Sequence, residues 1–316
     1  MSPRFACDPM AAEGDVSRAL ARELAAWLGQ APRVNSLQRL RGGESSECYR
    51  FDLTGGPASV PSALVLRLMR DDRAAAHECA VQTAVAAQGF PTPAIRRSGS
   101  SASAFGRPFC IMAFVVGRDP VASGAVRRLP QLLAATMAEL HALKIALSGR
   151  DIQAVIDDLR RSERREIAHA AMWFDDKAFA MSTFVLCHGD LHARNILMNG
   201  ERVVALLDWE IAVFAPPAYD VARTELLLRL MPGVGPITLR PLVRLLGRRA
   251  SRQFVDAYRA VHALDATALE HCRALHALRL VALVRSGDAA PGVHRLWRPF
   301  EAELARRWEA LTGVAL

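Results

Sequence analysis

The sequence has 316 residues, of which 51% are hydrophobic and 23% are charged, and its formal net charge is +8. A chain of this length and apolar content is expected to form two compact lobes with sizeable cores, which excludes a mainly disordered protein. Nearly all of the positive charge comes from arginine, and no basic run is interleaved with aromatic residues, so the sequence does not indicate a nucleic-acid partner.

The six cysteines are scattered without a CxxC spacing, a pattern typical of reduced thiols rather than of a disulfide framework or a zinc site. The amino-terminal residues do not combine a basic segment with a following apolar run, and no apolar stretch is long enough to cross a bilayer. We therefore expect a cytoplasmic protein that is not bound to a membrane.

Residues 1–116 are expected to form the smaller lobe. Ser17 is suited to cap a helix that carries apolar residues at helical spacing on one face. Two strands are predicted next, over residues 37–40 and 48–53, with a glycine-containing segment between them.

A strand, a glycine loop and a second strand are the order found in loops that contact phosphate oxygens, and in such a loop backbone N–H groups near Gly43 and the hydroxyl of Ser45 or Ser46 would make the contacts. An ordinary hairpin turn would have the same pattern, so this segment alone does not decide between the two.

A third strand, over residues 63–69, has an apolar pattern interrupted by one charge, Arg67. Because a buried charge needs a partner of opposite sign, Arg67 is expected either to form an ion pair or to lie exposed on an edge strand. A helix over residues 73–88 follows and ends at the glycine and prolines of residues 89–93. The apolar run of residues 108–116 is predicted to be another strand.

Residues 117–316 are expected to form a larger, mostly helical lobe. Helices are predicted over residues 126–146, 151–181, 224–230, 239–262, 267–284 and 296–311. His141, on the apolar face of the first of these, is interpreted as a structural histidine.

The most informative stretch interrupts these helices. Residues 183–186 form a short apolar strand that ends at His188-Gly-Asp190, where glycine allows the backbone to turn. Two further apolar runs are separated by Asn199-Gly200, which is a strong signal for a hairpin. Pairing of these runs brings Asn195 and Asp208 near each other, with Asp190 on the loop just before them.

Two carboxylates and a carboxamide therefore converge, and their oxygens are ligands that suit Mg²⁺. Phosphoryl transfer uses such a set, with one carboxylate to orient the attacking hydroxyl and an Asn with an Asp to hold Mg²⁺ on the ATP phosphates. The segment His188-Gly-Asp-Leu-His-Ala-Arg-Asn195, followed by Asp208-Trp-Glu210, resembles the catalytic and metal-binding loops of the aminoglycoside phosphotransferase and choline kinase-like family.

The resemblance implies an α+β, protein-kinase-like fold with two lobes. The small N-terminal lobe of antiparallel strands, residues 1–116, would bind the nucleotide, and residues 117–316 would form the catalytic and substrate lobe. The resemblance further implies that Arg67 contacts the α- and β-phosphates of ATP and pairs with Glu78 on the next helix. Backbone groups from Ala113 to Val115 would bind adenine.

In the larger lobe the resemblance assigns catalysis to Asp190 and Mg²⁺ binding to Asn195 and Asp208. His188 is expected to support the loop, and Asp220 to cap the next helix and brace the loop. The resemblance leaves open the roles of three further polar residues, namely His192, Arg194 and Glu210. Ala215-Pro216 departs from the Gly-Asp that is common in the family, which makes the local turn uncertain.

The acceptor is expected to be a small molecule with a hydroxyl group. Residues 221–316 contain fifteen arginines and eight acidic residues, an excess of seven positive charges. This balance disfavours a polycationic aminoglycoside and favours a neutral or anionic acceptor, such as a macrolide, a sugar or a hydroxyacyl metabolite.

Several alternatives stay open. The chain could be an aminoglycoside O-phosphotransferase despite its charge, or a nucleotide-binding protein without catalytic activity. A protein kinase is disfavoured because no Asp-Phe-Gly pattern follows Asp208. A metallohydrolase would use His188, Asp190 and His192 as ligands on one side of an extended strand.

Overall fold

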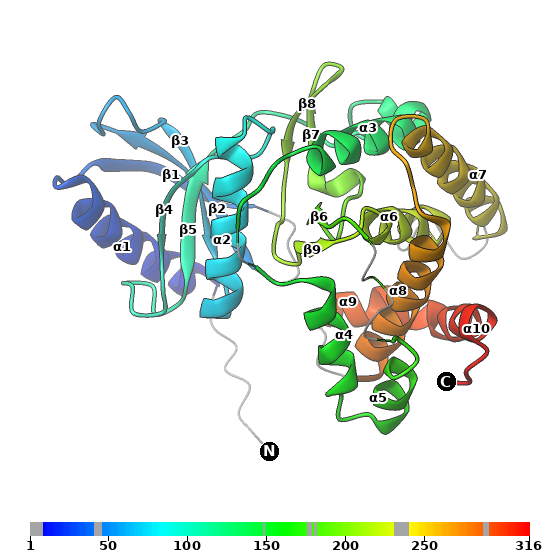
Figure 1. Ribbon diagram of the computed structural model, residues 1–316. Helices are drawn as coiled ribbons and strands as arrows, with labels where there is room; N and C mark the ends of the chain where they lie inside the picture. The colour runs from blue at the N-terminus through cyan, green and yellow to red at the C-terminus, as the bar shows by residue number, and fades with distance from the viewer. Residues whose placement is uncertain are drawn as a thin grey trace. The chain divides into compact units, whose positions relative to one another are not determined.

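The computed structural model of the chain describes residues 9–40, 46–147, 149–175, 179, 182–230, 240–286 and 291–316 (Figure 1). The chain divides into two compact units. The first consists of Met1–Thr83 and Pro93–Val115, and the second of Ala84–Thr92 and Val116–Leu316.

The first unit is built on a five-stranded antiparallel sheet with the strand order β1-β2-β3-β5-β4. Its strands are β1 (Arg33–Arg39), β2 (Glu47–Thr54), β3 (Ala63–Leu68), β4 (Ile95–Gly99) and β5 (Phe109–Ala113). Helix α1 (Pro9–Leu28) precedes the sheet, and helix α2 (Asp72–Ala87) follows β3 and extends with its last residues into the second unit.

The two faces of this sheet are covered by different helices because side chains alternate along a strand. In β3, Leu64 and Leu66 belong to a buried cluster with Leu20 of α1. Val65 instead packs in a cluster that contains Cys79 of α2. Arg67 shares the face of Val65, so the only charge of this strand points toward α2.

Two predicted boundaries in this unit are wrong. Helix α1 begins at Pro9 rather than at Ser17, because the residues before Ser17 include alanines and a glutamate that favour helix. Strand β1 begins at Arg33, and a bulge between Asn35 and Leu37 hides its alternation. The prediction missed β4 as well, because its residues are mostly polar and exposed.

The second unit contains most of the helices. They are α3 (Leu129–His141), α4 (Ile152–Arg160), α5 (Arg165–Ala171), α6 (Ala218–Leu230), α7 (Arg240–Arg259), α8 (Ala266–Ser286), α9 (Pro291–Trp297) and α10 (Glu301–Thr312), with 3₁₀ turns η1 (Ala125–Arg128), η2 (Ala193–Asn195) and η4 (Arg298–Phe300). Helix α6 packs against both α7 and α8, α3 packs against α7, and α10 packs against α8. Trp308 of α10 and Tyr258 of α7 are fully buried in this core.

Two short antiparallel sheets in the described part of this unit carry the loops of interest. Strand β6 (Val185–Cys187) pairs with β9 (Val213–Ala215), and β7 (Ile196–Asn199) pairs with β8 (Arg202–Leu206). The predicted hairpin is confirmed, with Ile196 opposite Leu206 and Gly200 in the turn at a φ of 60°.

Two predicted helices in this unit are wrong in extent. Residues 126–146 form only η1 and α3, which ends at His141. Residues 151–181 do not form one helix, because the polar residues between Arg160 and Arg165 interrupt it and separate α4 from α5. Among the described residues, no helix has both the length and the apolar character that crossing a membrane requires.

Candidate active site

Strand β6 is followed by a turn whose backbone is hydrogen-bonded to one buried carboxylate. Asp220, in the first turn of α6, accepts hydrogen bonds from the backbone N–H of His188 at 2.7 Å and of Gly189 at 2.6 Å. Gly189 has a φ of +82°, and a Cβ there would lie 2.6 Å from the carbonyl oxygen of Ile211. The turn therefore requires glycine at this position.

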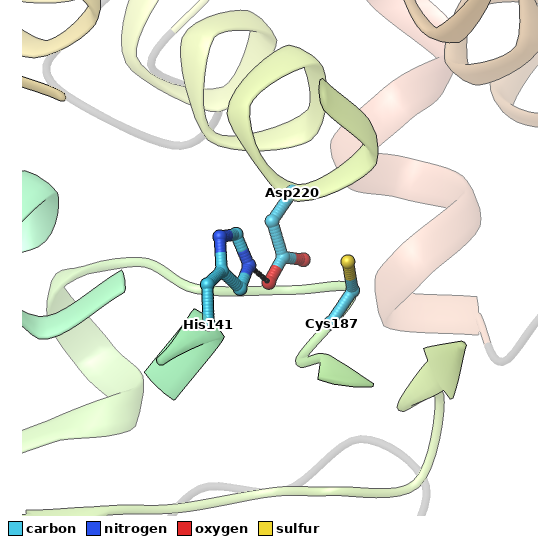
Figure 2. A group of neighbouring side chains, drawn as sticks. All are labelled: His141, Cys187 and Asp220. Carbon is cyan, nitrogen blue, oxygen red and sulfur yellow. Dashed lines mark hydrogen bonds and ion pairs between the residues drawn. The ribbon is translucent and has the colours of Figure 1, made fainter. Parts of the chain in front are cut away.

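Figure 2 shows that Asp220 also receives a hydrogen bond from His141, with Cys187 beside them. His141 Nε2 lies 3.2 Å from Asp220 Oδ2, and His141 Nδ1 lies 2.7 Å from the hydroxyl of Tyr258. The prediction that His141 is structural and that Asp220 braces the loop is confirmed by these contacts. The capping prediction for Asp220 is wrong, because Asp220 lies inside α6 and binds the backbone of His188 and Gly189 instead.

His141, Cys187 and Asp220 form the one group of His, Cys, Asp and Glu side chains with metal-like spacing that the described residues contain. The ligand atoms of these three side chains are not available to a metal ion. Both nitrogens of His141 and both oxygens of Asp220 are hydrogen-bonded within the protein, and burial raises the pKa of Cys187 well above its ordinary value. These contacts indicate a structural cluster rather than a metal site.

The carboxylate of Asp190 is contacted by Arg223 and His192. Arg223 of α6 donates to Oδ1 from Nε at 3.1 Å and from an NH₂ group at 2.8 Å. His192 Nε2 lies 3.3 Å from Oδ2. Burial alone would raise the pKa of Asp190, but Arg223 and His192 outweigh it and hold this pKa well below its ordinary value. Asp190 is therefore ionised at neutral pH.

His188 connects Asp190 to Leu207, the residue before Asp208. Its Nδ1 accepts from the backbone N–H of Asp190 at 3.2 Å, and its Nε2 donates to the carbonyl of Leu207 at 2.9 Å. Burial lowers the pKa of His188, while the charges of Asp220, Asp190 and Asp208 act in the opposite direction. The expected supporting role of His188 is confirmed.

Asn195 and Asp208 come from the two ends of the β7–β8 hairpin. The side-chain NH₂ of Asn195 donates to the carbonyl of Asp190 at 3.0 Å, and the carbonyl of Asn195 accepts from Leu207 N–H at 2.8 Å. Asp208 follows with a φ of 68°, an uncommon conformation for a residue with a side chain. The structure therefore brings Asp190, Asn195 and Asp208 to one place.

This donor set fits Mg²⁺. Because the amide NH₂ of Asn195 is used by the carbonyl of Asp190, the side-chain oxygen of Asn195 remains as a hard ligand, and the carboxylate of Asp208 is a second one from the other end of the hairpin. The arrangement does not fit the metal triad of a hydrolase, because both ring nitrogens of His188 are occupied by the backbone.

In the first unit, Arg67 forms the ion pair that a buried charge requires. Its NH1 lies 2.9 Å from Oε1 of Glu78, and the two side chains are 9% and 2% exposed. The alternative of an exposed Arg67 on an edge strand is excluded, since β3 lies between β2 and β5.

The other residues that were predicted to contact the nucleotide differ in what the structure shows of them. Gly43 and Ser45 lie outside the described residues. The hydroxyl of Ser46 is buried and forms no hydrogen bond within the described chain. The N–H of Ala113 donates to Ala94 at 3.0 Å, whereas the N–H of Val115 is bound to no backbone carbonyl among the described residues.

Arg223 was missed by the sequence analysis. Its only sequence signal is its position three residues after Asp220, which places both residues on the side of α6 that faces the catalytic turn. Thr224, also on α6, donates to the carbonyl of Leu191 at 2.8 Å. Helix α6 thus contacts the turn and the loop after it through Asp220, Arg223 and Thr224.

The chain matches the model of the phosphotransferase enzyme family over residues 36–224. The acyl-CoA dehydrogenase family member 11 of Rattus norvegicus is 29% identical over 226 residues, which are 61% of this chain and 28% of that protein. The chain thus spans less than a third of the length of this relative.

Among solved structures, a choline/ethanolamine kinase family protein from Mesorhizobium loti has a TM-score of 0.62 and 18% identity, and the match covers 96% of this chain and 95% of that one. A thermostable mutant of aminoglycoside phosphotransferase APH(4)-Ia, in a ternary complex with AMP-PNP and hygromycin B, has a TM-score of 0.60 and 18% identity, covering 93% and 98%. The predicted fold class and family resemblance are confirmed.

Proposed function

The chain belongs to the phosphotransferase enzyme family, and we propose that it transfers the γ-phosphate of ATP, with Mg²⁺, to a hydroxyl group of a small neutral or anionic molecule. Membership of this family makes the chain a phosphotransferase with an alcohol group as acceptor. The observation that carries the finer proposal is the ionised carboxylate of Asp190 beside the oxygen-bearing side chains of Asn195 and Asp208.

Asp190 is proposed to accept a hydrogen bond from the acceptor hydroxyl and to orient it. A carboxylate with a depressed pKa is a weak base, but phosphoryl transfer passes through a loose transition state in which the position of the hydroxyl matters more than early proton removal. The acceptor oxygen bonds to the γ-phosphorus as the bond to the bridging oxygen breaks and ADP leaves. The hydroxyl proton passes late to Asp190 and then to solvent.

Asn195 and Asp208 would hold Mg²⁺, which would neutralise charge on the phosphates of ATP. The hydrogen bond from Asn195 to the carbonyl of Asp190 ties the metal-binding side chain to the catalytic loop. The positive φ of Asp208 is consistent with a backbone position kept for function at a cost of about 1–3 kcal/mol.

Residues 1–116 are proposed to bind the nucleotide, and residues 117–316 to bind the acceptor and perform the chemistry. Arg67, held by Glu78, would contact the α- and β-phosphates. Gly43, Ser45 and Ser46 would cover the phosphates, and the backbone from Ala113 to Val115 would contact adenine. The AMP-PNP bound in the similar APH(4)-Ia structure supports an adenine nucleotide.

Two other functions compete with this proposal. An aminoglycoside acceptor is suggested by the hygromycin B bound to APH(4)-Ia, but the arginine excess of residues 221–316 opposes a polycationic substrate. A nucleotide-binding protein without activity would bind ATP and release no phosphorylated product.

The test is a panel assay. The purified full chain is incubated with ATP and Mg²⁺ and with neutral, anionic and cationic alcohols, and ADP release and the phosphorylated product are measured by mass spectrometry. We expect product from a neutral or anionic alcohol and none with EDTA. Product from aminoglycosides only would refute the acceptor class, and ATP binding without any product would refute the activity.

A further inference from the structure

Arg279 of α8 is a half-buried cation that lacks an acidic partner. Its NH1 group donates to the hydroxyl of Tyr219, and its guanidinium carbon lies 5.8 Å from the centroid of that ring. Among the described residues no carboxylate lies within ion-pair distance of it. Tyr219 cannot neutralise the charge, because burial raises the pKa of its hydroxyl.

Other arginines of these helices have the partners that Arg279 lacks. Arg285, near the end of α8, pairs with Glu301 at 2.9 Å. Arg273, also on α8, pairs with Glu225 at 2.7 Å. A guanidinium that is partly removed from water without a counter-ion is costly, so an uncompensated Arg279 needs a reason in function.

Arg279 is connected to Asp190 through two residues of α6. Tyr219 and Arg223 are one turn apart on α6 and therefore share a face of that helix. Tyr219 contacts Arg279, and Arg223 contacts Asp190 at 2.8 Å. Burial and the charges of Arg223 and Arg150 lower the pKa of Arg279, and the charges of Tyr219 and Asp190 act in the opposite direction.

We propose that the acceptor is an anionic alcohol, and that Arg279 binds its carboxylate or phosphate group and so brings its hydroxyl to Asp190. The proposal rests on the phosphotransferase function proposed above and narrows its acceptor. The planar fork of donors in arginine matches the oxygens of a carboxylate or a phosphate. An acceptor ammonium would be repelled by the charges of Arg279 and Arg223, while the carboxylate of Asp190 is already paired with Arg223.

The second unit also has a cavity lined by arginines, but this cavity does not suit the binding of the acceptor's anionic group. A cavity of about 570 Å³ is lined by residues that include Arg285, Arg298 and Arg306, and by Glu301 and Glu309. Its arginines are accompanied by carboxylates, and none of its lining residues contacts Asp190. The cluster at Arg279 is therefore the better match for an anion that must lie near the reacting hydroxyl.

The experiment uses the full chain and acceptors of matched length. Each set contains an ω-hydroxy carboxylate, the corresponding hydroxyalkyl phosphate, the neutral amide and the amino alcohol, in a short and a long version. Phosphorylated product is measured with ATP and Mg²⁺ for the wild type and for Arg279→Gln, Arg279→Lys and the control Arg285→Gln, which changes an arginine of the same helix that has a carboxylate partner.

We expect an anionic acceptor to give the highest kcat/KM. Comparing the hydroxy carboxylate with the hydroxyalkyl phosphate shows which of the two anionic groups Arg279 binds. Arg279→Gln should raise the KM of that acceptor at least tenfold and leave its kcat and the KM of ATP within about twofold. Arg279→Lys should recover part of the loss, and Arg285→Gln should match the wild type.

Two results would overturn the inference while the proposed function stands. One is a neutral amide or amino alcohol that is phosphorylated as well as its anionic counterpart. The other is an Arg279→Gln enzyme that loses the same factor on neutral and anionic acceptors, or that behaves like Arg285→Gln. Absence of product from every alcohol, together with absence of ADP release, would overturn the proposed function as well.

Discussion

Arg223 donates two hydrogen bonds to the same oxygen of Asp190, from Nε at 3.1 Å and from an NH₂ group at 2.8 Å. The other oxygen of Asp190 faces His192 at 3.3 Å. A carboxylate held in this way has a fixed orientation and a fixed charge, which is what the positioning of an attacking hydroxyl requires. We therefore propose that Arg223 is a positioning residue that acts through Asp190.

Replacing Arg223 should reduce catalysis without affecting nucleotide binding. We expect Arg223→Gln to lower kcat by about tenfold to hundredfold, because Asp190 loses its orientation and its neighbouring positive charge. Arg223→Lys should recover part of the activity, since it restores the charge but not the two-pronged contact. The measurement is steady-state kinetics with the KM of ATP determined separately.

The matched control is Arg244→Gln, which removes an arginine that pairs with Glu303 at 2.9 Å and is half exposed. This variant should keep kcat within about twofold. An Arg223→Gln enzyme as active as the Arg244→Gln enzyme would contradict the positioning role.

Asp220 should matter for stability as well as for activity. Its two oxygens accept from two backbone N–H groups and from His141, and Asn at this position would place an NH₂ group against a donor. We expect Asp220→Asn to reduce the free energy of unfolding by about 2–4 kcal/mol. Urea denaturation followed by circular dichroism measures this loss.

Asp265→Asn is the control for this change, because Asp265 accepts from the N–H of Ala268 at the start of α8 and asparagine can replace it there. Its expected cost is below about 0.5 kcal/mol. Equal stability of the two variants would show that Asp220 does not brace the turn.

Gly189 should not tolerate a side chain. At a φ of +82° and with Ile211 O 2.6 Å from a built Cβ, Gly189→Ala is expected to cost about 2–4 kcal/mol of unfolding free energy. Gly200→Ala shares a positive φ of +60° but has no atom within 4 Å of its Cβ, so it should cost about 1 kcal/mol. Thermal and urea unfolding of the two variants measure the steric contribution. Similar losses of unfolding free energy in both would contradict the close approach of Ile211 to Gly189.

His276 makes stability depend on pH. Burial lowers the pKa of His276 well below its usual value, and the charges of Arg279 and Arg223 lower it further. A histidine with a depressed pKa binds more protons when unfolded, so it favours unfolding as the pH falls below about 6.5. The free energy of unfolding should therefore decrease from about pH 7 to about pH 5, with a slope of up to about 1.4 kcal/mol per pH unit from this residue.

The comparison for this effect is His276→Gln, which keeps a donor for the carbonyl of Tyr219 but does not titrate. Its unfolding free energy should fall less steeply than that of the wild type over the same range. Identical slopes would show that another group carries the dependence.

Local signals in the sequence predicted much of the site. Asn199-Gly200 between two apolar runs predicted the hairpin that brings Asn195 and Asp208 together, because a two-residue turn fixes which residues face each other. The lone charge in β3 predicted the buried pair of Arg67 and Glu78, since a buried charge requires a partner.

Arg223 and Arg279 could not be found in this way. Arg223 contacts a loop that lies 33 residues away in the sequence, and Arg279 reaches Tyr219 only because α8 packs against α6. Helical periodicity indicates which face of α6 is buried but not which loop lies against it. The same limit explains the missed strand β9, which has three residues and exists because it pairs with β6.

The most direct test of the site is a single-turnover measurement of γ-phosphate transfer from ATP by Asp190→Asn. Asparagine keeps the size of the side chain and removes its charge, and nucleotide binding is measured in parallel by calorimetry with Mg²⁺. We predict that Asp190→Asn binds ATP as the wild type does and transfers phosphate at least about a hundredfold more slowly. Transfer at the wild-type rate would contradict the assignment of catalysis to Asp190.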